Sequence, residues 1–407
     1  MTVTGFKNDL LGSLEEVINR RRANGLFRSL YLPSQDAVDF CSNDYLGVAR
    51  SKEFEEAVSV SYDKVQESCR LGSTGSRLLT GNSEYYEQVE EYLKNFHSGE
   101  SALLFNSGYD CNLGIISSLP QPGDWVVYDD LVHNSIREGL KLSRGRAVKF
   151  AHNDVKDLEQ VLLNIRQGVI DDENKTKNII VSVESVYSMD GHCAPLGEMV
   201  TICKKFGANL VVDEAHGIGV FGEQGRGWCN ELNVEADVFA RVYTFGKAMG
   251  AHGAVVIGPR ILRDYLINYA RPLIYSTALP LHTLVTISES YKFCEKYANV
   301  RQKYLRELVK VFRQRVKSSK VVGQSFEDDE GDEVSSLNSM SPIQGIVIPG
   351  NENVVRVSKL LQASGFDVKP IRSPTVPAGS ERLRIIIHYY NTEEEIETLL
   401  DCIEKLS

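Results

Sequence analysis

Polar side chains of complementary chemistry follow two strand-like apolar runs in the second half of the chain. Lys247 follows the run 242–245 and lies among small residues, whereas Asp213 and His216 follow the run 209–212. The carboxyl ends of parallel strands meet at one edge of a sheet, where open α/β sheets bind ligands. We therefore expect an amine nucleophile, a carboxylate and an imidazole to lie together in one site.

This combination of groups suits pyridoxal 5'-phosphate (PLP). The lysine would form a Schiff base with the cofactor aldehyde, and the aspartate would pair with the pyridinium nitrogen and keep the ring an electron sink. A lone lysine after a strand is more often a solvated loop residue. An aspartate after two valines is also typical of a Mg²⁺-binding ATPase, but the sequence contains no Gly-x-x-x-x-Gly-Lys-Ser/Thr loop to accompany it.

The composition is that of an ordinary globular protein. The chain has 407 residues, 42% of them hydrophobic and 25% charged, which suits two domains or one large domain with an appendage. Its net charge of −10 argues against a nucleic-acid partner, because binding phosphates requires clustered Lys and Arg. No apolar run approaches the ~20 residues that span a membrane, so we expect no membrane partner.

The cysteines and the first residues bear on the cellular compartment. Eight cysteines are scattered without a Cys-x-x-Cys pair, as expected for reduced thiols. The first residues include Asp9 and lack an apolar signal core, so they resemble neither a secretory signal nor a transit peptide. We therefore expect a cytoplasmic protein.

Strand-like and helix-like segments alternate from about residue 101 to residue 250. The predicted strands are 101–105, 125–128, 148–151 and 178–183, and the predicted helices between later strands are 155–165 and 199–206. This alternation predicts a mostly parallel sheet with helices on both faces. Ser107, His133 and Ser188 also follow strands and join the expected site. The glycine turn before the helix near 108 predicts an anion cradle of backbone N–H groups.

The pattern divides into three parts. We expect an N-terminal helical segment over 1–45, a large PLP-binding domain over 46–288 and a smaller C-terminal α/β domain over 289–407. A long helical pattern over 281–315 would connect the two domains. The acidic stretch 323–341 predicts a surface insertion.

Six stretches of the sequence resemble the α-oxoamine synthases, which are PLP enzymes of fold type I. They are 42–47, 150–155, 188–191, 213–217, 222–227 and 244–247. The resemblance extends from about residue 14 to residue 406, and together the stretches are highly specific. It implies an α/β protein of PLP fold type I, with a mostly parallel sheet flanked by helices and a smaller C-terminal domain. It also implies a homodimer whose active sites lie at the subunit interface.

The resemblance assigns roles to the candidate residues, and no metal is expected. Lys247 would hold the cofactor and exchange the substrate proton. Asp213 would bind the pyridine nitrogen, His216 the ring hydroxyl, and His133 would stack on the ring. The other cofactor contacts would be Gly108, Tyr109 and Thr244 at the phosphate, Ser188 near the phenolic oxygen, and Ser276 and Thr277 at the partner subunit's phosphate. An ordinary turn before a proline remains an alternative for the last two.

The resemblance also assigns substrate contacts. Arg384 would clamp the amino-acid carboxylate, because a guanidinium group matches a carboxylate with two hydrogen bonds. Asn43 would share that carboxylate, and Thr375 would make a weaker contact. Arg28 would meet the far carboxylate of a pimeloyl chain, although a solvated arginine explains it nearly as well.

Two stretches favour family members that condense L-alanine with a pimeloyl thioester, carried by coenzyme A or a carrier protein. They are 251–255, and 374–379 together with 382–384. His252 stands where a small polar residue is usual and leaves substrate choice open. The alternatives are glycine C-acetyltransferase or 5-aminolevulinate synthase, and a non-catalytic partner subunit, which usually lacks the lysine. A dinucleotide-binding oxidoreductase would need a Gly-x-Gly-x-x-Gly turn after its first strand, where the sequence has none.

Overall fold

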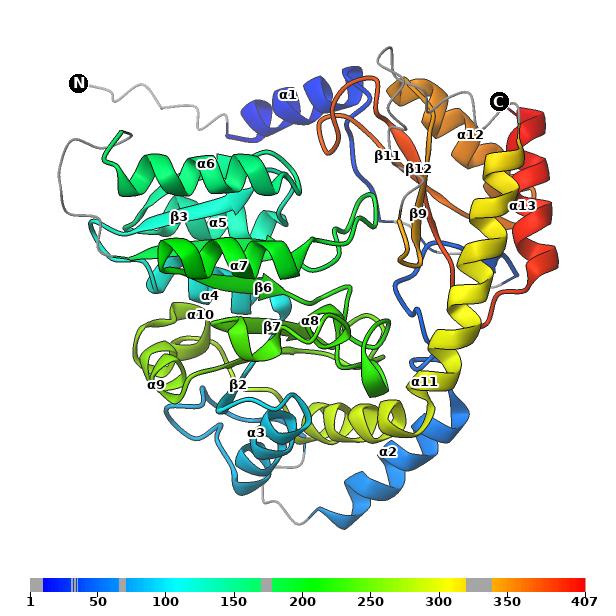
Figure 1. Ribbon diagram of the computed structural model, residues 1–407. Coiled ribbons are helices and arrows are strands. Elements are labelled where there is room, and N and C mark those ends of the chain that lie inside the picture. Colours follow the sequence, from blue (N-terminus) through cyan, green and yellow to red (C-terminus); the bar gives the residue numbers. More distant parts are fainter. Residues whose placement is uncertain are drawn as a thin grey trace, which may run out of the picture.

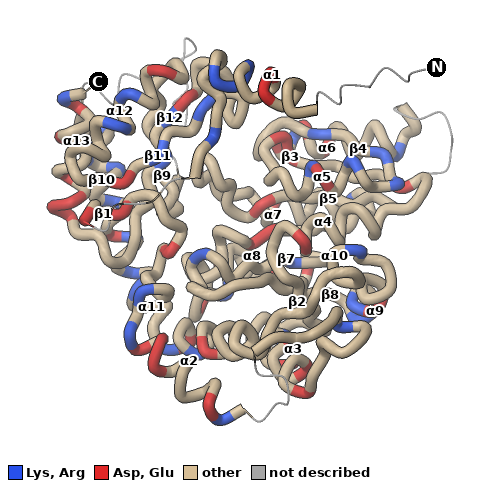
Figure 2. Tube along the Cα trace, turned by 180° about the vertical axis from the view of Figure 1, so that it is seen from behind, with Lys and Arg blue, Asp and Glu red and all other residues tan. Residues whose placement is uncertain are grey.

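A computed structural model describes residues 10–30, 32, 34, 36–65, 71–169, 178–319 and 339–406. The expected acidic insertion lies outside the described residues except for 339–341. A larger body with a central sheet and a smaller body stand side by side, and the long helix α11 (Leu281–Ser318) runs from one to the other (Figure 1). Basic and acidic residues are interspersed along the chain (Figure 2).

The larger body is built on a seven-stranded sheet with the order β2-β8-β7-β6-β5-β3-β4. Its strands are β2 (Ser101–Phe105), β3 (Trp125–Asp129), β4 (Arg146–Phe150), β5 (Ile179–Glu184), β6 (Ala208–Asp213), β7 (Ala240–Thr244) and β8 (Ala254–Gly258). Only β8 runs against its neighbours, β2 and β7. The mostly parallel sheet predicted from the alternation is therefore confirmed, with one antiparallel strand that the alternation did not predict.

Helices cover both faces of this sheet. They are α3 (Glu84–Phe96), α4 (Gly108–Ser118), α5 (Asn134–Leu142), α6 (Val155–Arg166), α7 (Leu196–Phe206), α8 (Trp228–Glu231), α9 (Arg260–Tyr269) and α10 (Arg271–Ile274), whereas α2 (Lys52–Lys64) packs against α11. Successive strand residues point to opposite faces, so Leu104 joins the core under α3, α6 and α7, whereas Leu103 joins the core under α4, α5 and α9. Burial on both faces explains why these strands are continuous apolar runs rather than alternating ones.

The smaller body combines the C-terminal residues with part of the N-terminal segment. Its elements are the antiparallel strands β11 (Lys369–Ile371), β12 (Arg382–Ile386) and β9 (Ile343–Val347), with helices α12 (Asn351–Ala363) and α13 (Glu393–Leu406). β1 (Val38–Asp39) pairs in parallel with β10 (Phe366–Asp367), whereas α1 (Leu10–Ala23) has no buried residue. The end of the segment expected over 1–45 thus pairs with the C-terminal body, and the division into three parts stays a prediction.

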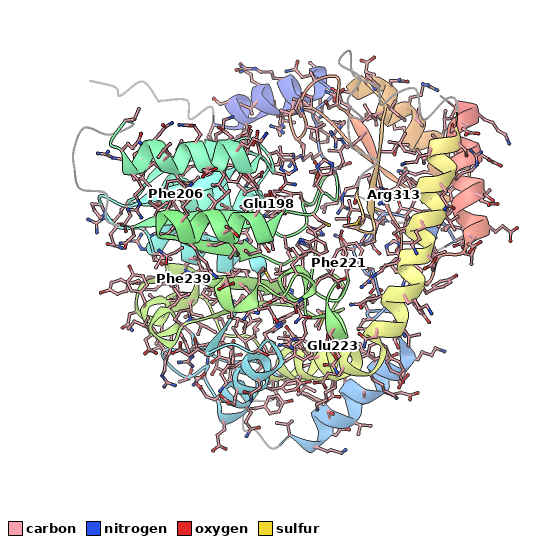
Figure 3. The ribbon with its side chains drawn as sticks, in the orientation of Figure 1. Glu198, Phe206, Phe221, Glu223, Phe239 and Arg313 are labelled. Atoms are coloured by element: carbon pink, nitrogen blue, oxygen red, sulfur yellow. The ribbon has the colours of Figure 1, made fainter. Side chains whose placement is uncertain are left out.

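Helix α11 belongs to both bodies, and the domain boundary expected at 288/289 falls inside it. In Figure 3, Glu223 lies beside the lower part of α11, whereas Arg313 lies near its upper end beside α13. At that end Arg315 pairs with Asp401 and Glu404 at 2.7 Å each. None of the helices in the described part of the chain has the length and apolar character to cross a membrane.

Candidate active site

A pocket of about 270 Å³ lies at the carboxyl ends of the large sheet's parallel strands. Nine of the sequence-predicted site residues line it: Asn43, Ser107, Gly108, Tyr109, His133, Asp213, His216, Thr244 and Lys247. The strand-end argument therefore places the groups after β2, β3, β6 and β7 correctly in one cavity. His252, which departs from the usual small polar residue, also lines the pocket.

Lys247 contacts a histidine inside the pocket. Its Nζ lies 2.9 Å from Nε2 of His216, and Nδ1 of that histidine lies 2.6 Å from the Tyr45 hydroxyl. Burial lowers the pKa of Lys247 to about 8, although the carboxylates of Asp213 and Glu184 oppose the shift. An amine with such a pKa is substantially neutral near pH 8, as a nucleophile or general base requires.

His216 is a neutral imidazole in this environment. Burial lowers its pKa well below the usual value, and the positive charges of Lys247 and Arg384 lower it further. Its hydrogen bond to the buried Tyr45 hydroxyl holds the ring in place from the side opposite Lys247. No sequence pattern singled out Tyr45 for this role, because the two residues are 171 positions apart.

Asp213 ends β6 as a buried carboxylate with a partner on each oxygen. Its Oδ2 accepts a hydrogen bond from Asn112 Nδ2 at 2.7 Å, and its Oδ1 accepts one from the backbone N–H of Ala215 at 2.9 Å. Asn112 also donates to Ser135 Oγ at 3.0 Å, which lies 2.8 Å from Nδ1 of His133. One chain of hydrogen bonds therefore positions both the carboxylate and the predicted stacking ring.

Glu184 is a pocket residue that was not among the sequence-predicted candidates. It ends β5 and pairs in register with Asp213 on β6, and it is 2% exposed. Burial raises its pKa well above the usual range, and the neighbouring Asp213 charge adds to the shift. Its neutral form is therefore favoured beside the charge of Asp213. The strand-end rule that indicated Asp213 applies equally to Glu184, so the sequence did contain a signal.

The start of α4 forms a cradle with the end of β7. Gly108 and Tyr109 begin the helix at the pocket wall, where backbone N–H groups favour an anion. Thr244 is 8% exposed. Its hydroxyl oxygen, Oγ1, has no hydrogen-bond partner within the protein. A Cβ at position 108 would lie 2.3 Å from Thr244 Cγ2. Glycine is therefore required for the helix to approach β7 this closely.

Arg384 reaches the edge of the pocket from β12 in the smaller body. Its Nη2 donates to Asn43 Oδ1 at 3.1 Å, and its Nε donates to the carbonyl oxygen of Ser188 at 2.7 Å. The two predicted carboxylate contacts are thus neighbours. Ser188 is not among the pocket-lining residues, and it contacts Arg384 through its backbone rather than its predicted hydroxyl.

The remaining predicted residues lie outside the pocket within one chain. Arg28 is exposed in the segment after α1, and Thr375 is exposed in the turn after β11. Ser276 is half-buried and Thr277 is exposed in the segment after α10, where the Thr277 carbonyl accepts a hydrogen bond from Asn106 Nδ2 at 2.8 Å. The roles of these four residues stay predictions.

The residues in the pocket fit PLP. A lysine amine of lowered pKa suits the aldehyde, and a buried carboxylate held by Asn112 and the Ala215 N–H suits the pyridine nitrogen. The N-terminus of α4 and the unpartnered Thr244 hydroxyl suit the phosphate. The neutral His216 suits the ring hydroxyl. Each polar group of the cofactor would therefore meet a complementary group of this chain.

Comparisons with known proteins agree with this geometry. A curated relative from Emericella nidulans named 8-amino-7-oxononanoate synthase is 40% identical over 405 residues, which cover 97% of this chain and 95% of the relative. A solved 8-amino-7-oxononanoate synthase from Francisella tularensis covers 91% of this chain and 98% of its own, with 27% identity and a TM-score of 0.72.

A solved serine palmitoyltransferase from S. paucimobilis is also similar, and its structure contains bound PLP. It is 26% identical, covers 99% of this chain and 98% of its own, and superposes with a TM-score of 0.82. The family model described as aminotransferase class I and II matches residues 35–403. The chain therefore belongs to the aminotransferase class I and II family of PLP enzymes.

Proposed function

We propose that this protein condenses L-alanine with a pimeloyl thioester to give 8-amino-7-oxononanoate, with release of CO₂ and the carrier thiol, as a step of biotin biosynthesis. The relatives that share this name are similar over nearly the whole chain. The observation that carries the proposal is the Lys247 amine, whose pKa is lowered to about 8 in a pocket shared with Asp213 and His216. A non-catalytic subunit would have no need of this arrangement.

Lys247 would hold the cofactor and then move the proton of the amino-acid α-carbon. Bound PLP supplies the electron sink that stabilises negative charge at that carbon. Asp213 would keep the ring nitrogen protonated, because its carboxylate is fixed by Asn112 and by the Ala215 N–H. General acid–base catalysis of this kind contributes ~10²–10⁴-fold to the rate.

Arg384 and Asn43 would orient the substrate. The guanidinium group of Arg384 already donates hydrogen bonds to Asn43 Oδ1 and to the Ser188 carbonyl. When the amino acid binds, a charged oxygen of its carboxylate would replace the neutral Asn43 oxygen as an acceptor of Arg384. Charge-assisted hydrogen bonds of this type are roughly twice as strong as neutral ones. The carboxylate held there is also the group lost as CO₂ after the new carbon–carbon bond has formed.

We extend the proposal to assembly and location. Ser276 and Thr277 lie outside the pocket of their own chain, which supports a homodimer in which they contact the partner subunit's phosphate. The seven cysteines described are all free thiols, which supports a reducing compartment such as the cytoplasm. Light scattering of the purified protein tests the dimer, and cell fractionation tests the location.

The decisive experiment measures turnover with defined substrates. The purified, PLP-loaded protein is mixed with L-alanine and pimeloyl-CoA while free thiol and product mass are followed. Thiol release with a product of the mass of 8-amino-7-oxononanoate is expected. A loaded, folded enzyme that releases no thiol from either pimeloyl-CoA or a pimeloyl carrier protein would contradict the proposal.

A second candidate function is a sister condensation with serine and a long-chain thioester. The higher TM-score of the serine palmitoyltransferase, 0.82 against 0.72, is the observation that favours it. The same assay therefore includes L-serine with palmitoyl-CoA and glycine with acetyl-CoA and succinyl-CoA. We expect the ratio kcat/KM to be highest for L-alanine with the pimeloyl thioester, and a higher value for another pair would reassign the substrates.

A further inference from the structure

A second cluster of polar side chains lies outside the pocket, where the turn that follows β5 meets the segment after β4. Asp190 and His192 come from the turn and His152 from the segment, and one ligand-type atom of each lies within 4.8 Å of the other two. The turn closes through the backbone hydrogen bonds from Tyr187 N to His192 O and from Gly191 N to Tyr187 O. It brings His192 to His152, which is 40 positions earlier in the chain.

His152 is prepared as a ligand by the group behind it. Its Nδ1 lies 2.9 Å from the carboxylate of Asp129, which is 0% exposed at the end of β3. A carboxylate only accepts hydrogen bonds, so Nδ1 carries the proton and Nε2 presents its lone pair. This carboxylate–histidine arrangement is the one that orients metal-ligating histidines in proteins. The lone pair on Nε2 faces Nδ1 of His192 at 3.0 Å.

Asp190 supplies a second observation, separate from the geometry of the two histidines. It is 5% exposed, and its Oδ1 has no hydrogen-bond partner within the protein. That oxygen lies 3.9 Å from Nδ1 of His192, while the other oxygen, Oδ2, lies 4.0 Å from Arg382 Nη1. A hydrogen bond between His152 and His192 gives both imidazoles a partner. It leaves the buried Oδ1 of Asp190 without a hydrogen bond, which costs free energy.

We infer that His152, Asp190 and His192 bind one divalent transition-metal ion of the zinc type. Two imidazole nitrogens and a carboxylate oxygen are ligands that zinc accepts, and a water would complete a tetrahedral site. Zn–N bonds of ~2.0–2.1 Å at a tetrahedral angle place two nitrogens about 3.3 Å apart. The observed 3.0 Å must therefore open by only a few tenths of an ångström.

The ion would replace the proton that the two histidines share, and it would neutralise the unpartnered oxygen of Asp190. Two of its ligands, Asp190 and His192, lie in the turn whose Ser188 carbonyl accepts the hydrogen bond from Arg384. It does not depend on the proposed reaction, because none of its three ligands lines the PLP pocket.

Calorimetric titration of the chelator-treated, PLP-loaded full chain with Zn²⁺ tests the inference. We expect one ion per chain, and visible absorption bands of a low-symmetry site when Co²⁺ is used instead. His192→Asn and Asp190→Asn should each weaken zinc binding by at least about 10-fold, because each removes a direct ligand. Loss of a residue that only hydrogen-bonds to a metal ligand already lowers metal affinity by about 10–100-fold.

His282→Asn is the matched control, because it makes the same change at an exposed histidine on α11. It should leave the stoichiometry and affinity unchanged. Circular dichroism and the PLP absorbance show whether the two ligand variants remain folded. No uptake of zinc by the unaltered protein, or equal affinity in the folded ligand variants, would overturn the inference.

Discussion

The two walls of the pocket differ in how much water surrounds their functional groups. The inner wall belongs to the large sheet, and its Asp213, Glu184 and His216 are each less than 5% exposed. The outer wall comes from segments outside that sheet, where Asn43 lines the pocket and Arg384 lies behind it as its hydrogen-bond partner; both are only half-buried. The inner groups interact strongly with one another because little water screens them. The pKa values of Glu184 and His216 are shifted, and so is that of Lys247, which is half-buried beside them.

This difference in burial corresponds to two tasks: adjusting the pKa values of the groups that transfer protons, and binding the substrate carboxylate. Proton transfer at the inner wall needs groups whose pKa values have been shifted by burial, as those of Lys247 and Glu184 are. Recognition of a carboxylate at the outer wall needs only a permanent positive charge of the right shape. Substitutions at the inner wall should therefore affect kcat or protonation, whereas those at the outer wall should affect substrate affinity.

The largest effect is expected for Lys247→Ala. Turnover should fall by at least ~10³-fold, because both the covalent hold on the cofactor and the α-proton acid–base group are lost. Thiol release measures the loss, and circular dichroism checks the fold. Lys141→Ala, at an exposed lysine of α5, is the control and should retain full activity. Substantial turnover by Lys247→Ala would contradict the role of the inner wall in cofactor attachment and proton transfer.

The next largest effect is expected for Arg384→Ala. KM for the amino acid should rise by ~10–100-fold, because hydrogen bonds between charged groups are each worth about 1.5–3 kcal/mol. Arg384→Lys keeps the positive charge but loses the planar guanidinium group, which can donate two parallel hydrogen bonds to a carboxylate. It should therefore recover only part of the affinity for the amino acid. An unchanged KM combined with a fall in kcat would mean that this arginine acts at the inner wall.

A pH effect on cofactor capture should follow from the pKa of Lys247, which is lowered to about 8. Only the neutral amine attacks an aldehyde, so the rate at which the cofactor-free protein takes up PLP should rise with pH, with a midpoint near 8. Stopped-flow absorbance measures this rate. A midpoint near the ordinary value of 10.5 would show that the amine is solvated instead of buried.

The smallest effect on activity is expected for Glu184→Gln, which should instead change the pH dependence of stability. Because burial raises the folded-state pKa of Glu184, its stabilising contribution is complete below its unfolded pKa, near 4.5, and is lost as pH rises through the folded value. Glutamine is neutral throughout, so the Tm of the variant relative to the parent should increase with pH. A constant Tm difference between pH 5 and pH 9 would show that Glu184 does not change its protonation on folding.

The amino-acid sequence alone determined the alternating architecture and most of the inner wall. Apolar runs that end in polar residues identified the strands before Lys247, Asp213 and His133, and parallel strands necessarily bring such ends to one edge. This rule depends only on local pattern and direction. Ser188 also follows a strand but is not among the residues that line the pocket, so its role stays a prediction.

Only the tertiary structure decided which distant groups meet and how burial changes them. The hydrogen bonds from Asn112 to Asp213 and between Tyr45 and His216, and the turn that brings His192 to His152, join residues 40 to 171 positions apart. The raised pKa of Glu184 likewise depends on its depth in the protein. Such contacts and shifts arise from packing distances and lost solvent, and no local sequence period encodes either of these.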